Sequence, residues 1–445
     1  MAPVTASSDA SAPFHPASSS DYLPREPLRR LQSQRLRQAV ARAFEHVPLY
    51  RQRMQKHGVA PEEIRGVEDL VRLPLTVLGD LHAGYPFGLM AVPVQQVARL
   101  YRPGGGTSKP LVVGYTRRDL DAWTEVLVRC LAACGIQPGD VLQNVYGHDW
   151  CADALGLHYG AEAMGATVVP TSGDDVDRQL AAMKDFNVTA VCCAPSHFLR
   201  LIERAEKTGL DLRELPLRIA VFLAETWSEA LRRRIQQAAG IKAYDLFGPS
   251  EIIGPGVGAE CCCQNGLHVL EDHFYPEIVD PATGAPLPDG QEGELVLTTL
   301  AREAMSLIRY RTRDLTAIVA EPCPCGRTMR RIRRIGLHSD DRFVLQGVGV
   351  LPSQIEAALL AVEGTSPHYQ IVLSQENGLD QAEVLVEVTP QILSDRVRAM
   401  ERLQSQLAAQ IEEALGISVT VRLVESHTLQ RSQGKVQRVV DKRAL

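Results

Sequence analysis

Residues 217–248 read LRIAVFLAETWSEALRRRIQQAAGIKAYDLFG, two short apolar runs with a helical pattern between them. The runs at 217–225 and 241–248 have the length and composition of buried strands. The same pattern recurs upstream in DVLQNVYG (140–147), ATVVPTS (166–172) and TAVCCAPS (189–196), with helix-like segments between them. Strands that alternate with helices predict parallel α/β layers.

The chain of 445 residues is too long for one ordinary core, so we expect more than one domain. Residues 293–319 have the composition of an antiparallel, β-rich subdomain. Beyond residue 340 the strand–helix–strand–strand–helix–strand order fits a small ferredoxin-like α+β domain. We therefore predict a disordered tail at 1–21, a large α/β domain at 22–339 and a small domain at 340–445.

Composition excludes several classes of function. The net charge of −6 does not indicate binding to nucleic acid or to an anionic membrane. The sequence contains no run of about 18 apolar residues, the length needed to span a bilayer. The ten cysteines include the clusters CCC, CC and CPC, a spacing too close for a disulfide framework. We expect reduced thiols in a cytoplasmic protein.

The loop RPGGGTSKP at residues 102–110 looks built to hold phosphate. A P-loop needs Gly-Lys followed by Ser or Thr, whereas here Lys109 follows Ser108 and precedes Pro110, so that interpretation fails. What remains is a glycine loop whose backbone N–H groups could form an anion nest. The residues alone leave a mobile surface turn open as the alternative.

Four further motifs accompany this loop in a fixed order. YDLFGPSEIIGPGV (244–257), IRYRTRDLT (308–316), RIGLHSDD (334–341) and LQRSQGKVQR (429–438), together with RPGGGTSKPLVVGYTRRDL (102–120), resemble the motifs of the adenylate-forming superfamily. EDHFYPEI, LPDGQEGELV and YPFGLMAVP extend the resemblance, which is closest to the phenylacetate–CoA ligase branch of aryl-CoA ligases. The resemblance covers about residues 22–440.

The resemblance implies a two-step reaction. A carboxylate attacks the α-phosphate of ATP to give an acyl-adenylate and pyrophosphate, and the thiol of coenzyme A then displaces AMP. Phe247 matches a ring that stacks on adenine, and Asp314 matches the acid that accepts both ribose hydroxyls. The nucleotide-binding residues implied are Gly104, Gly105, Gly106, Thr107, Lys109, Glu225, Phe247, Gly248 and Asp314.

The resemblance assigns catalytic roles to two further residues. Glu251 matches the carboxylate that holds Mg²⁺ against the phosphates, a hard oxygen ligand suited to that ion. Lys435 matches the lysine that bridges the carboxylate and α-phosphate oxygens during adenylation. Asp340 lies at the family's hinge, about which the small domain rotates between half-reactions. Read alone, each has a structural explanation, such as a helix N-terminal acid or a solvated lysine.

The acyl pocket is expected near NVYGHDW, LAETW and GPSEII. The resemblance implies that Tyr146, His148, Ala224, Pro249 and Ile252 line it. The neighbouring pair His148–Asp149 would make the pocket polar enough for an amino- or hydroxy-substituted ring. A His–Asp pair satisfied within its own loop is the equally weighted alternative.

The cysteines form a second constellation. Cys261 and His268 flank a glycine turn, and Cys323 and Cys325 follow in CPCG. Three thiolates and an imidazole make a tetrahedral structural zinc site, and some members of the resembled branch have one here. A set of free cysteines is the alternative, and the choice among Cys261, Cys262 and Cys263 stays open.

The phosphate loop departs from the resembled family, whose loop reads approximately S-S-G-T-T-G-K-P. Two hydroxyl positions are glycine here and the first serine is Pro103. The positions before and after the hinge also differ, at Leu337, His338, Gln346 and Gly349. Hydrogen bonds to charged partners are worth ~1.5 to 3 kcal/mol each, so losing two would slow adenylation by ~10² to 10⁴.

Three functions follow from these observations. The first is an ATP-dependent ligase that joins a phenylacetate-, benzoate- or anthranilate-type acid to coenzyme A. The second is an acyltransferase from an aryl-CoA thioester to an acyl carrier protein, motivated by the altered loop and the basic stretch QRSQGKVQRVVDKR. The third is a nucleotide-binding relative without catalysis. A homodimer is also left open.

Overall fold

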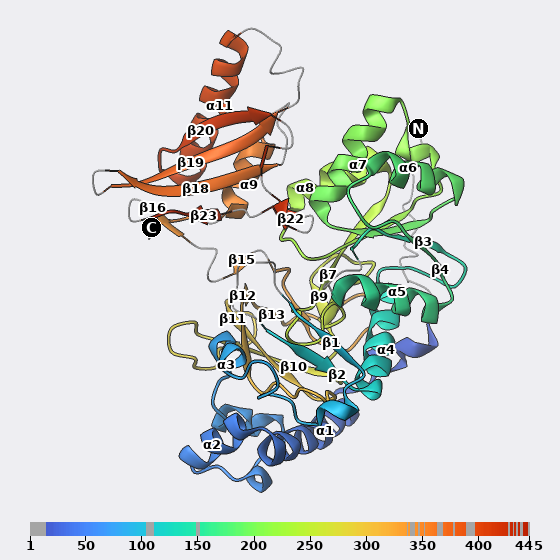
Figure 1. The fold of residues 1–445 in the computed structure, drawn as a ribbon, viewed down its shortest axis with the longest axis vertical. Coiled ribbons are helices and arrows are strands. Elements are labelled where there is room, and N and C mark those ends of the chain that lie inside the picture. The colour runs from blue at the N-terminus through green and yellow to red at the C-terminus, as the bar shows by residue number, and fades with distance from the viewer. Residues whose placement is uncertain are drawn as a thin grey trace. The chain divides into compact units, whose positions relative to one another are not determined.

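The computed structural model describes residues 15–103, 111–147, 152–335, 337–338, 343–345, 348–350, 352–362, 368–376, 379–388, 397–425, 428–429, 431–432, 435–436 and 439–443. They form two compact units (Figure 1). The first unit comprises residues 1–193, 215–223 and 242–334. The second comprises residues 194–214, 224–241 and 335–445. The predicted boundary near residue 340 stays a prediction.

The first unit is built around a long mixed sheet. Its strand order is β13 (Ile318–Val319), β14 (Arg331–Ile332), β9 (Leu267–Val269), β8 (Gly258–Glu260), β7 (Lys242–Phe247), β6 (Ile219–Phe222), β5 (Ala190–Cys193), β3 (Val141–Asn144) and β4 (Thr167–Pro170). From β7 to β4 all pairs are parallel, as the sequence predicts. From β7 to β13 they are antiparallel. The chain therefore leaves β7 where the sheet changes from parallel to antiparallel.

Helices cover this sheet and pack closely against one another. α4 (Arg117–Ala133) begins at the capping residue Thr116 and packs on α5 (Ala152–Met164), while α6 (Val176–Asp185) links β4 to β5. A Cβ atom on Gly156 of α5 would lie 2.4 Å from the ring of Trp123. Because only glycine leaves room there, α5 can approach α4 at this point.

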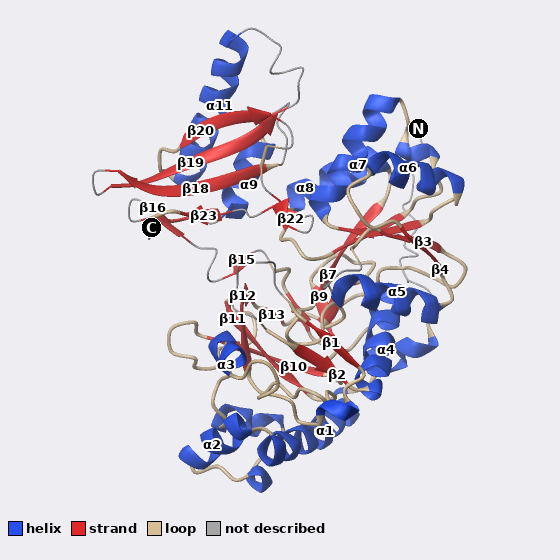
Figure 2. Ribbon diagram, viewed as in Figure 1, coloured by secondary structure: helices blue, strands red, loops and turns tan. Residues whose placement is uncertain are grey.

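Shorter strands flank the main sheet (Figure 2). β1 (Arg99–Tyr101) and β2 (Val113–Tyr115), which precede and follow the glycine loop in the sequence, pair antiparallel. β10 (Phe274–Val279), β11 (Gly293–Thr299) and β12 (Tyr310–Thr316) form the antiparallel subdomain expected from residues 293–319. This unit also contains the short 3₁₀ helices η2 (Pro61–Glu63), η3 (Val67–Arg72) and η4 (Val94–Gln96) and the short helix α3 (Leu78–Ala83).

The helical pattern near the N-terminus is interrupted once. α1 (Arg25–His46) and α2 (Pro48–Lys56) are two separate helices divided at Val47. Pro48 is the first residue of α2, and a proline there ends the preceding helix because it cannot donate an amide hydrogen bond. Leu28, Leu36 and Val40 are buried along α1.

The predicted tail does not extend to residue 21. A 3₁₀ helix, η1 (Pro16–Tyr22), precedes α1, and Asp21 in it is 1% exposed. Its carboxylate accepts hydrogen bonds from Nε of Arg129 at 2.9 Å and from Nε of Arg327 at 3.2 Å. Two buried guanidinium groups thus hold this segment, a contact between distant residues that the Ser- and Ala-rich composition does not reveal.

The second unit contains a four-stranded sheet in the order β20 (Thr420–Glu425), β19 (Leu379–Val388), β18 (Tyr369–Glu376) and β23 (Val439–Asp441). α9 (Pro352–Leu360) and α11 (Val397–Leu415) pack on one another and contribute to its core. The small mixed domain is as predicted, but its sheet membership differs in one strand. Residues 343–345 (β16) pair with 348–350 (β17), and β23 pairs with β18 instead.

The remaining elements of the second unit include α7 (Pro195–Thr208) and α8 (Glu229–Ala239), which pack on each other, and η5 (Leu212–Glu214). The short strands are β15 (Leu337–His338), β21 (Arg431–Ser432) and β22 (Lys435–Val436). Among the described residues, no helix combines the length and the apolar character that crossing a bilayer requires.

Candidate active site

The turn that follows β7 carries Glu251. β7 ends at Phe247, and the amides of residues 252, 253 and 254 donate to the carbonyl of Pro249 at 3.0, 3.2 and 3.1 Å. A Cβ atom on Gly248 would lie 1.9 Å from the carbonyl oxygen of Gly254. The predicted nucleotide-binding residue Gly248 is therefore required by the close return of the chain.

Two aromatic residues hold the same turn from outside. The hydroxyl of Tyr115, in β2, donates to the carbonyl of Ile253 at 2.9 Å, and Nε1 of Trp123, in α4, donates to the carbonyl of Pro255 at 2.7 Å. The two rings are stacked with their centroids 5.2 Å apart, and both are buried. The turn is thus fixed to the strand that follows the glycine-rich loop.

The predicted magnesium and ribose acids both affect the pKa of one tyrosine, Tyr310. Asp314, in β12, is 2% exposed, and Glu251 is partly buried. Burial raises the pKa of Tyr310, the charge of Glu251 raises it further, Arg313 lowers it, and Asp314 again raises it. Both acids therefore lie within electrostatic reach of the Tyr310 phenol, although 63 residues separate them in the sequence.

Tyr146, predicted to line the acyl pocket, follows β3, and its hydroxyl reaches Leu223 at the end of β6. Its hydroxyl donates to the carbonyl of Leu223 at 2.9 Å and accepts from the amide of Leu223 at 3.2 Å. Of the other two predicted pocket residues in the first unit, Ile252 is buried and Pro249 partly so. The Tyr146 hydroxyl thus binds the backbone of the residue immediately before Ala224.

Ala224 and Glu225 belong to the second unit. Ala224 has φ of 75°, a left-handed conformation that costs a non-glycine residue about 1 to 2 kcal/mol. The carboxylate of Glu225 accepts from the Ser196 hydroxyl at 2.7 Å and from the Ser196 amide at 3.1 Å, at the first turn of α7. These bonds fix the conformation of a predicted nucleotide-binding acid.

Lys435 lies on a β-hairpin. β21 and β22 pair antiparallel, with Arg431 opposite Val436 and Ser432 opposite Lys435. Both ends of the segment are attached to the sheet of the second unit: the Leu429 amide donates to the buried carboxylate of Glu387 at 3.1 Å, and β23 pairs with β18. The lysine is therefore carried on a short ribbon with two anchored ends.

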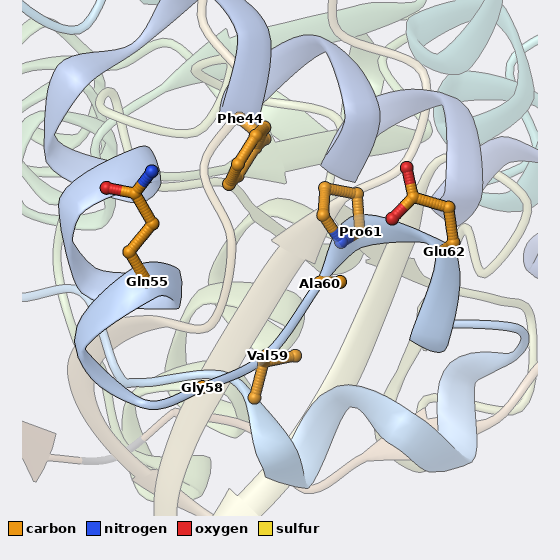
Figure 3. Close-up of a pocket in the computed structure, with 7 residues that line it drawn as sticks. All are labelled: Phe44, Gln55, Gly58, Val59, Ala60, Pro61 and Glu62. Atoms are coloured by element: carbon orange, nitrogen blue, oxygen red, sulfur yellow. The ribbon is translucent and has the colours of Figure 1, made fainter.

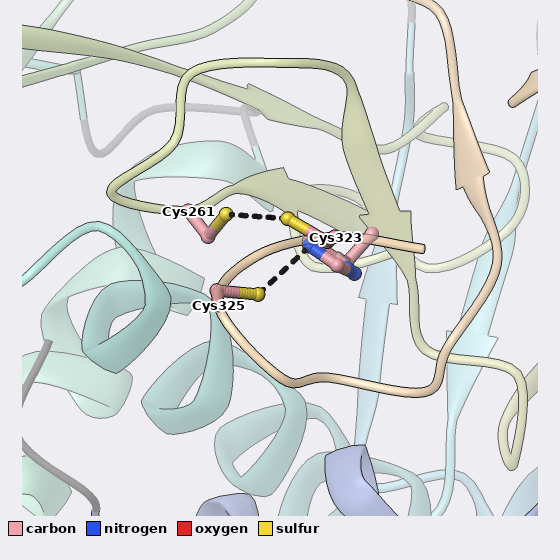
Figure 4. Close-up of side chains that lie close together, drawn as sticks. Cys261, Cys323 and Cys325 are labelled. Carbon is pink, nitrogen blue, oxygen red and sulfur yellow. Dashed lines mark hydrogen bonds between the residues drawn. The ribbon is translucent and has the colours of Figure 1, made fainter. Parts of the chain in front are cut away.

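The four predicted zinc ligands come together, and Figure 4 shows the three cysteines among them. Their ligand atoms, from Cys261, His268, Cys323 and Cys325, all lie within 4.8 Å of one another. The Cys261 and Cys323 sulfurs are 3.6 Å apart, and the Cys325 sulfur lies 3.4 Å from Nε2 of His268. A hydrogen bond with the Cys261 thiol lowers the pKa of Cys325, which favours the thiolate that a metal requires.

His268 is oriented from its other side. Its Nδ1 lies 3.3 Å from the carbonyl of Met329, a contact that leaves Nε2 facing the sulfurs when Nδ1 carries the proton. Among the three adjacent cysteines, the sulfur of Cys261 is the one grouped with His268, Cys323 and Cys325. Three sulfurs and one imidazole nitrogen are a donor set that fits a closed zinc site.

Comparison with known proteins identifies the family. The family model "AMP-binding enzyme" matches residues 127–300, and "AMP-binding enzyme C-terminal domain" matches residues 347–443. A phenylacetate-coenzyme A ligase of Thermus thermophilus is 46% identical over 437 residues, covering 95% of this chain and 98% of the relative. The chain belongs to the adenylate-forming superfamily, in its phenylacetate–CoA ligase branch. A second such ligase, from Escherichia coli K12, is 43% identical over 94% of this chain and 95% of its own length.

Solved structures of the superfamily have the same fold. A 2-hydroxyisobutyryl-CoA ligase in the postadenylation state, 27% identical, aligns with a TM-score of 0.87 over 97% of this chain and 94% of its own. An anthranilate CoA ligase, 17% identical, aligns with a TM-score of 0.61 over 77% of this chain and 66% of its own. The predicted fold class of a large α/β domain and a smaller C-terminal domain is confirmed.

The described residues hold only part of the predicted site. Phe247, Gly248, Pro249, Glu251, Ile252 and Asp314 lie in the first unit with Tyr146, whereas Ala224, Glu225 and the backbone of Lys435 lie in the second. Gly104, Gly105, Gly106, Thr107, Lys109, His148 and Asp340 lie outside the described residues. The roles of all these residues stay predictions.

Sequence reasoning missed three aromatic residues that contact or influence the predicted site residues. The pKa of Tyr310 is raised by both acids, and Tyr115 and Trp123 hold the Glu251 turn. Tyr115 and Tyr310 lie inside motifs that carry the family resemblance. The contact of Tyr115 joins it to Ile253, more than 130 residues away, and the surroundings of Tyr310 depend on the pairing of β12 with β11. Motif membership was the only available signal.

A pocket of about 370 Å³ lies elsewhere in the first unit, between α1 and the loop after α2 (Figure 3). Phe44, Val59 and Pro61 give it an apolar wall, and Gln55 and Glu62 lie at its sides. None of the predicted site residues lines it, and it brings no pair of acids or bases together. We do not assign it to the reaction.

Proposed function

We propose that this protein is an ATP-dependent ligase that joins an aromatic carboxylic acid of the phenylacetate type to coenzyme A. The observation that carries the proposal is the identity of 41 to 46% to phenylacetate-coenzyme A ligases over about 94 to 95% of the chain. The electrostatics of the site support it, because Glu251 and Asp314, assigned to opposite ends of the nucleotide, both raise the pKa of Tyr310.

The residues divide the adenylation step among them. Phe247 stacks on adenine, and the Asp314 carboxylate accepts hydrogen bonds from the ribose hydroxyls. The Glu251 carboxylate is a ligand for Mg²⁺, which neutralises phosphate charge when bound. Lys435 donates to the oxygens of the acid and the α-phosphate as charge develops between them. An oxygen of the acid forms the new bond to the α-phosphorus, and pyrophosphate leaves with the electron pair.

The second step uses the same centre. The thiolate of coenzyme A attacks the carbonyl carbon of the acyl-adenylate, and AMP leaves with the electron pair of the broken C–O bond. The curated relatives cited here are named as ligases, so the comparisons do not favour transfer to an acyl carrier protein or nucleotide binding without catalysis. The glycine loop that motivates the acyltransferase lies outside the described residues.

ATP–pyrophosphate exchange tests the proposal. Exchange should depend on an added acid among phenylacetate, benzoate, anthranilate and hydroxybenzoates, and a thioester should form when coenzyme A is added. Lys435→Ala should lower exchange by about 10² or more, the scale of one transition-state donor. The same variant should still convert a synthetic acyl-adenylate and coenzyme A to thioester. Absence of exchange with every acid tested would refute the ligase.

We also propose that Cys261, His268, Cys323 and Cys325 hold a structural zinc ion. Four protein ligands leave no open position, so the ion would join β9 and the segments around residues 261 and 323–325 and would not enter the reaction. Elemental analysis of the purified protein should find about one zinc per chain. Cys323→Ser should lose the metal and lower the unfolding temperature, whereas Cys262→Ser should keep it. Equal loss in both variants would contradict this ligand set.

The cytoplasmic location, the carrier-protein partner and the homodimer stay predictions. Every cysteine that the structure describes is a free thiol, in keeping with a reducing compartment. Light scattering on the purified protein measures its mass in solution and so decides between one chain and two.

A further inference from the structure

The strand that carries Asp314 is irregular where the acid lies. In the pairing of β11 with β12, Glu294 is opposite Leu315, and Val296 is opposite Arg311. The single residue Leu295 of β11 therefore faces residues 312–314 of β12. Such a bulge re-aims side chains and leaves backbone amides without partners in the ladder.

Side chains supply the missing partners. The Arg313 amide donates to Oε1 of Glu294 at 3.2 Å, and the Asp314 amide donates to Oγ1 of Thr312 at 3.1 Å. The Thr312 hydroxyl in turn donates to the carbonyl of Leu295 at 2.9 Å. In a regular strand the neighbouring strand would bind these backbone groups, so the three bonds stabilise the bulge in place of the ladder.

Glu294 is itself held firmly. Its carboxylate is 1% exposed, and Nε of Arg311 donates to its two oxygens at 3.0 and 3.1 Å. The Arg311 guanidinium also donates to the carbonyl of Pro281 at 2.6 Å. A buried carboxylate with a guanidinium partner and one amide partner is satisfied, and it presents a fixed oxygen to the Arg313 amide.

The backbone of the bulge is strained at one residue, Arg313. Arg313 has φ of 67°, in the left-handed region that residues other than glycine seldom adopt. The Glu294 oxygen accepts from this residue's own amide. Released from that bond, Arg313 would return toward extended conformation, and the side chain that follows it, Asp314, would turn away from its buried position.

We propose that Glu294 is a positioning residue for nucleotide binding: it holds the bulge that aims the Asp314 carboxylate at the cis-diol of the ATP ribose. The inference rests on the proposed function, since it takes Asp314 as the ribose acid. The ligand group concerned is the vicinal hydroxyl pair, so the effect of Glu294 on binding depends on the presence of those hydroxyls.

Calorimetric titration with ATP and with 2′,3′-dideoxyATP tests this in the full-length protein. Wild type should prefer ATP, and Asp314→Ala should lose that preference. Glu294→Ala should weaken ATP binding about tenfold or more while changing 2′,3′-dideoxyATP binding less than about twofold, on the scale of one hydrogen bond to a charged partner. Glu294→Gln should retain most of the preference, because its amide oxygen still accepts from the Arg313 amide.

A matched control separates positioning from general loss of stability. Glu277, in β10 of the same sheet, is a buried glutamate paired with Arg309 at 3.0 Å and makes no contact with the bulge amides described above. Glu277→Ala should lower the unfolding temperature and keep the preference for ATP. Glu294→Ala with Asp314→Ala should lose no more preference than Asp314→Ala alone.

Each other result overturns a defined step. If Glu294→Ala weakens both nucleotides equally, or keeps the preference that Asp314→Ala loses, Glu294 does not act through Asp314. If wild type binds both nucleotides equally, the ribose assignment of Asp314 fails, and this inference fails with it. A preserved pattern of binding without pyrophosphate exchange would refute the ligase proposal while supporting the role of Glu294.

Discussion

The Tyr115 hydroxyl donates a 2.9 Å hydrogen bond to the carbonyl of Ile253 and so joins the strand after the glycine-rich loop to the turn that carries Glu251. Tyr115→Phe removes this bond and leaves a buried carbonyl without its donor. We expect a loss of about 1 to 3 kcal/mol in stability and a several-fold rise in the KM for ATP with magnesium. Urea unfolding and pyrophosphate exchange measure the two effects. Tyr159→Phe, at an exposed ring, should change neither.

Gly248 admits no side chain. Gly248→Ala would place a Cβ atom 1.9 Å from the Gly254 carbonyl oxygen, so the turn must open to accept it. We expect adenylation to fall by about 10² or more, because displacement of a catalytic group by about 1 Å costs that much. Gly79→Ala is the control, since a Cβ there meets only one atom, at 3.9 Å. Equal exchange rates in the two variants would contradict a rigid turn.

Arg129 is the centre of a buried charge network. Its guanidinium donates to both oxygens of Asp272 at 3.0 and 2.8 Å and to Asp21 at 2.9 Å. Arg129→Met leaves two buried carboxylates without this partner, which should cost about 3 to 5 kcal/mol of unfolding free energy. Arg118→Met, at an exposed ion pair on the same helix, should cost about 1 kcal/mol or less. Denaturant titration compares the two.

Asp140 makes stability depend on pH. Burial would raise its pKa, but hydrogen bonds from Arg218, the Gln137 amide and the Thr189 hydroxyl hold the pKa below its ordinary value. The stabilisation is therefore present above the unfolded-state pKa of about 3.9 and is lost as pH falls through the lower folded-state value. Asp140→Asn should reduce the stability at pH 7 and flatten its decline below about pH 4. Thermal unfolding from pH 7 to pH 3 measures this, and an unchanged slope would contradict it.

Local patterns predicted the parallel strands well, because each of β3 to β7 is an apolar run long enough to be recognised alone. Motif order predicts that Glu251 and Asp314 serve one site; both carboxylates raise the pKa of Tyr310, and their roles stay predictions. The bulge at residues 312–314 was not predictable, because it exists only in the pairing of β12 with β11. The same holds for β23, which takes a sheet position that residues 343–345 seemed to suit.

The hydrogen bonds from Arg129 and Arg327 to Asp21 limit how far the N-terminus can be shortened. Trimming the chain at the boundary suggested by its composition would delete a carboxylate that two arginines share, one on α4 and one two residues beyond Cys325. A fragment beginning at residue 22 should therefore unfold at lower temperature and be cut faster by proteases than one beginning at residue 15. A truncation should therefore end before η1, and an affinity tag belongs upstream of it.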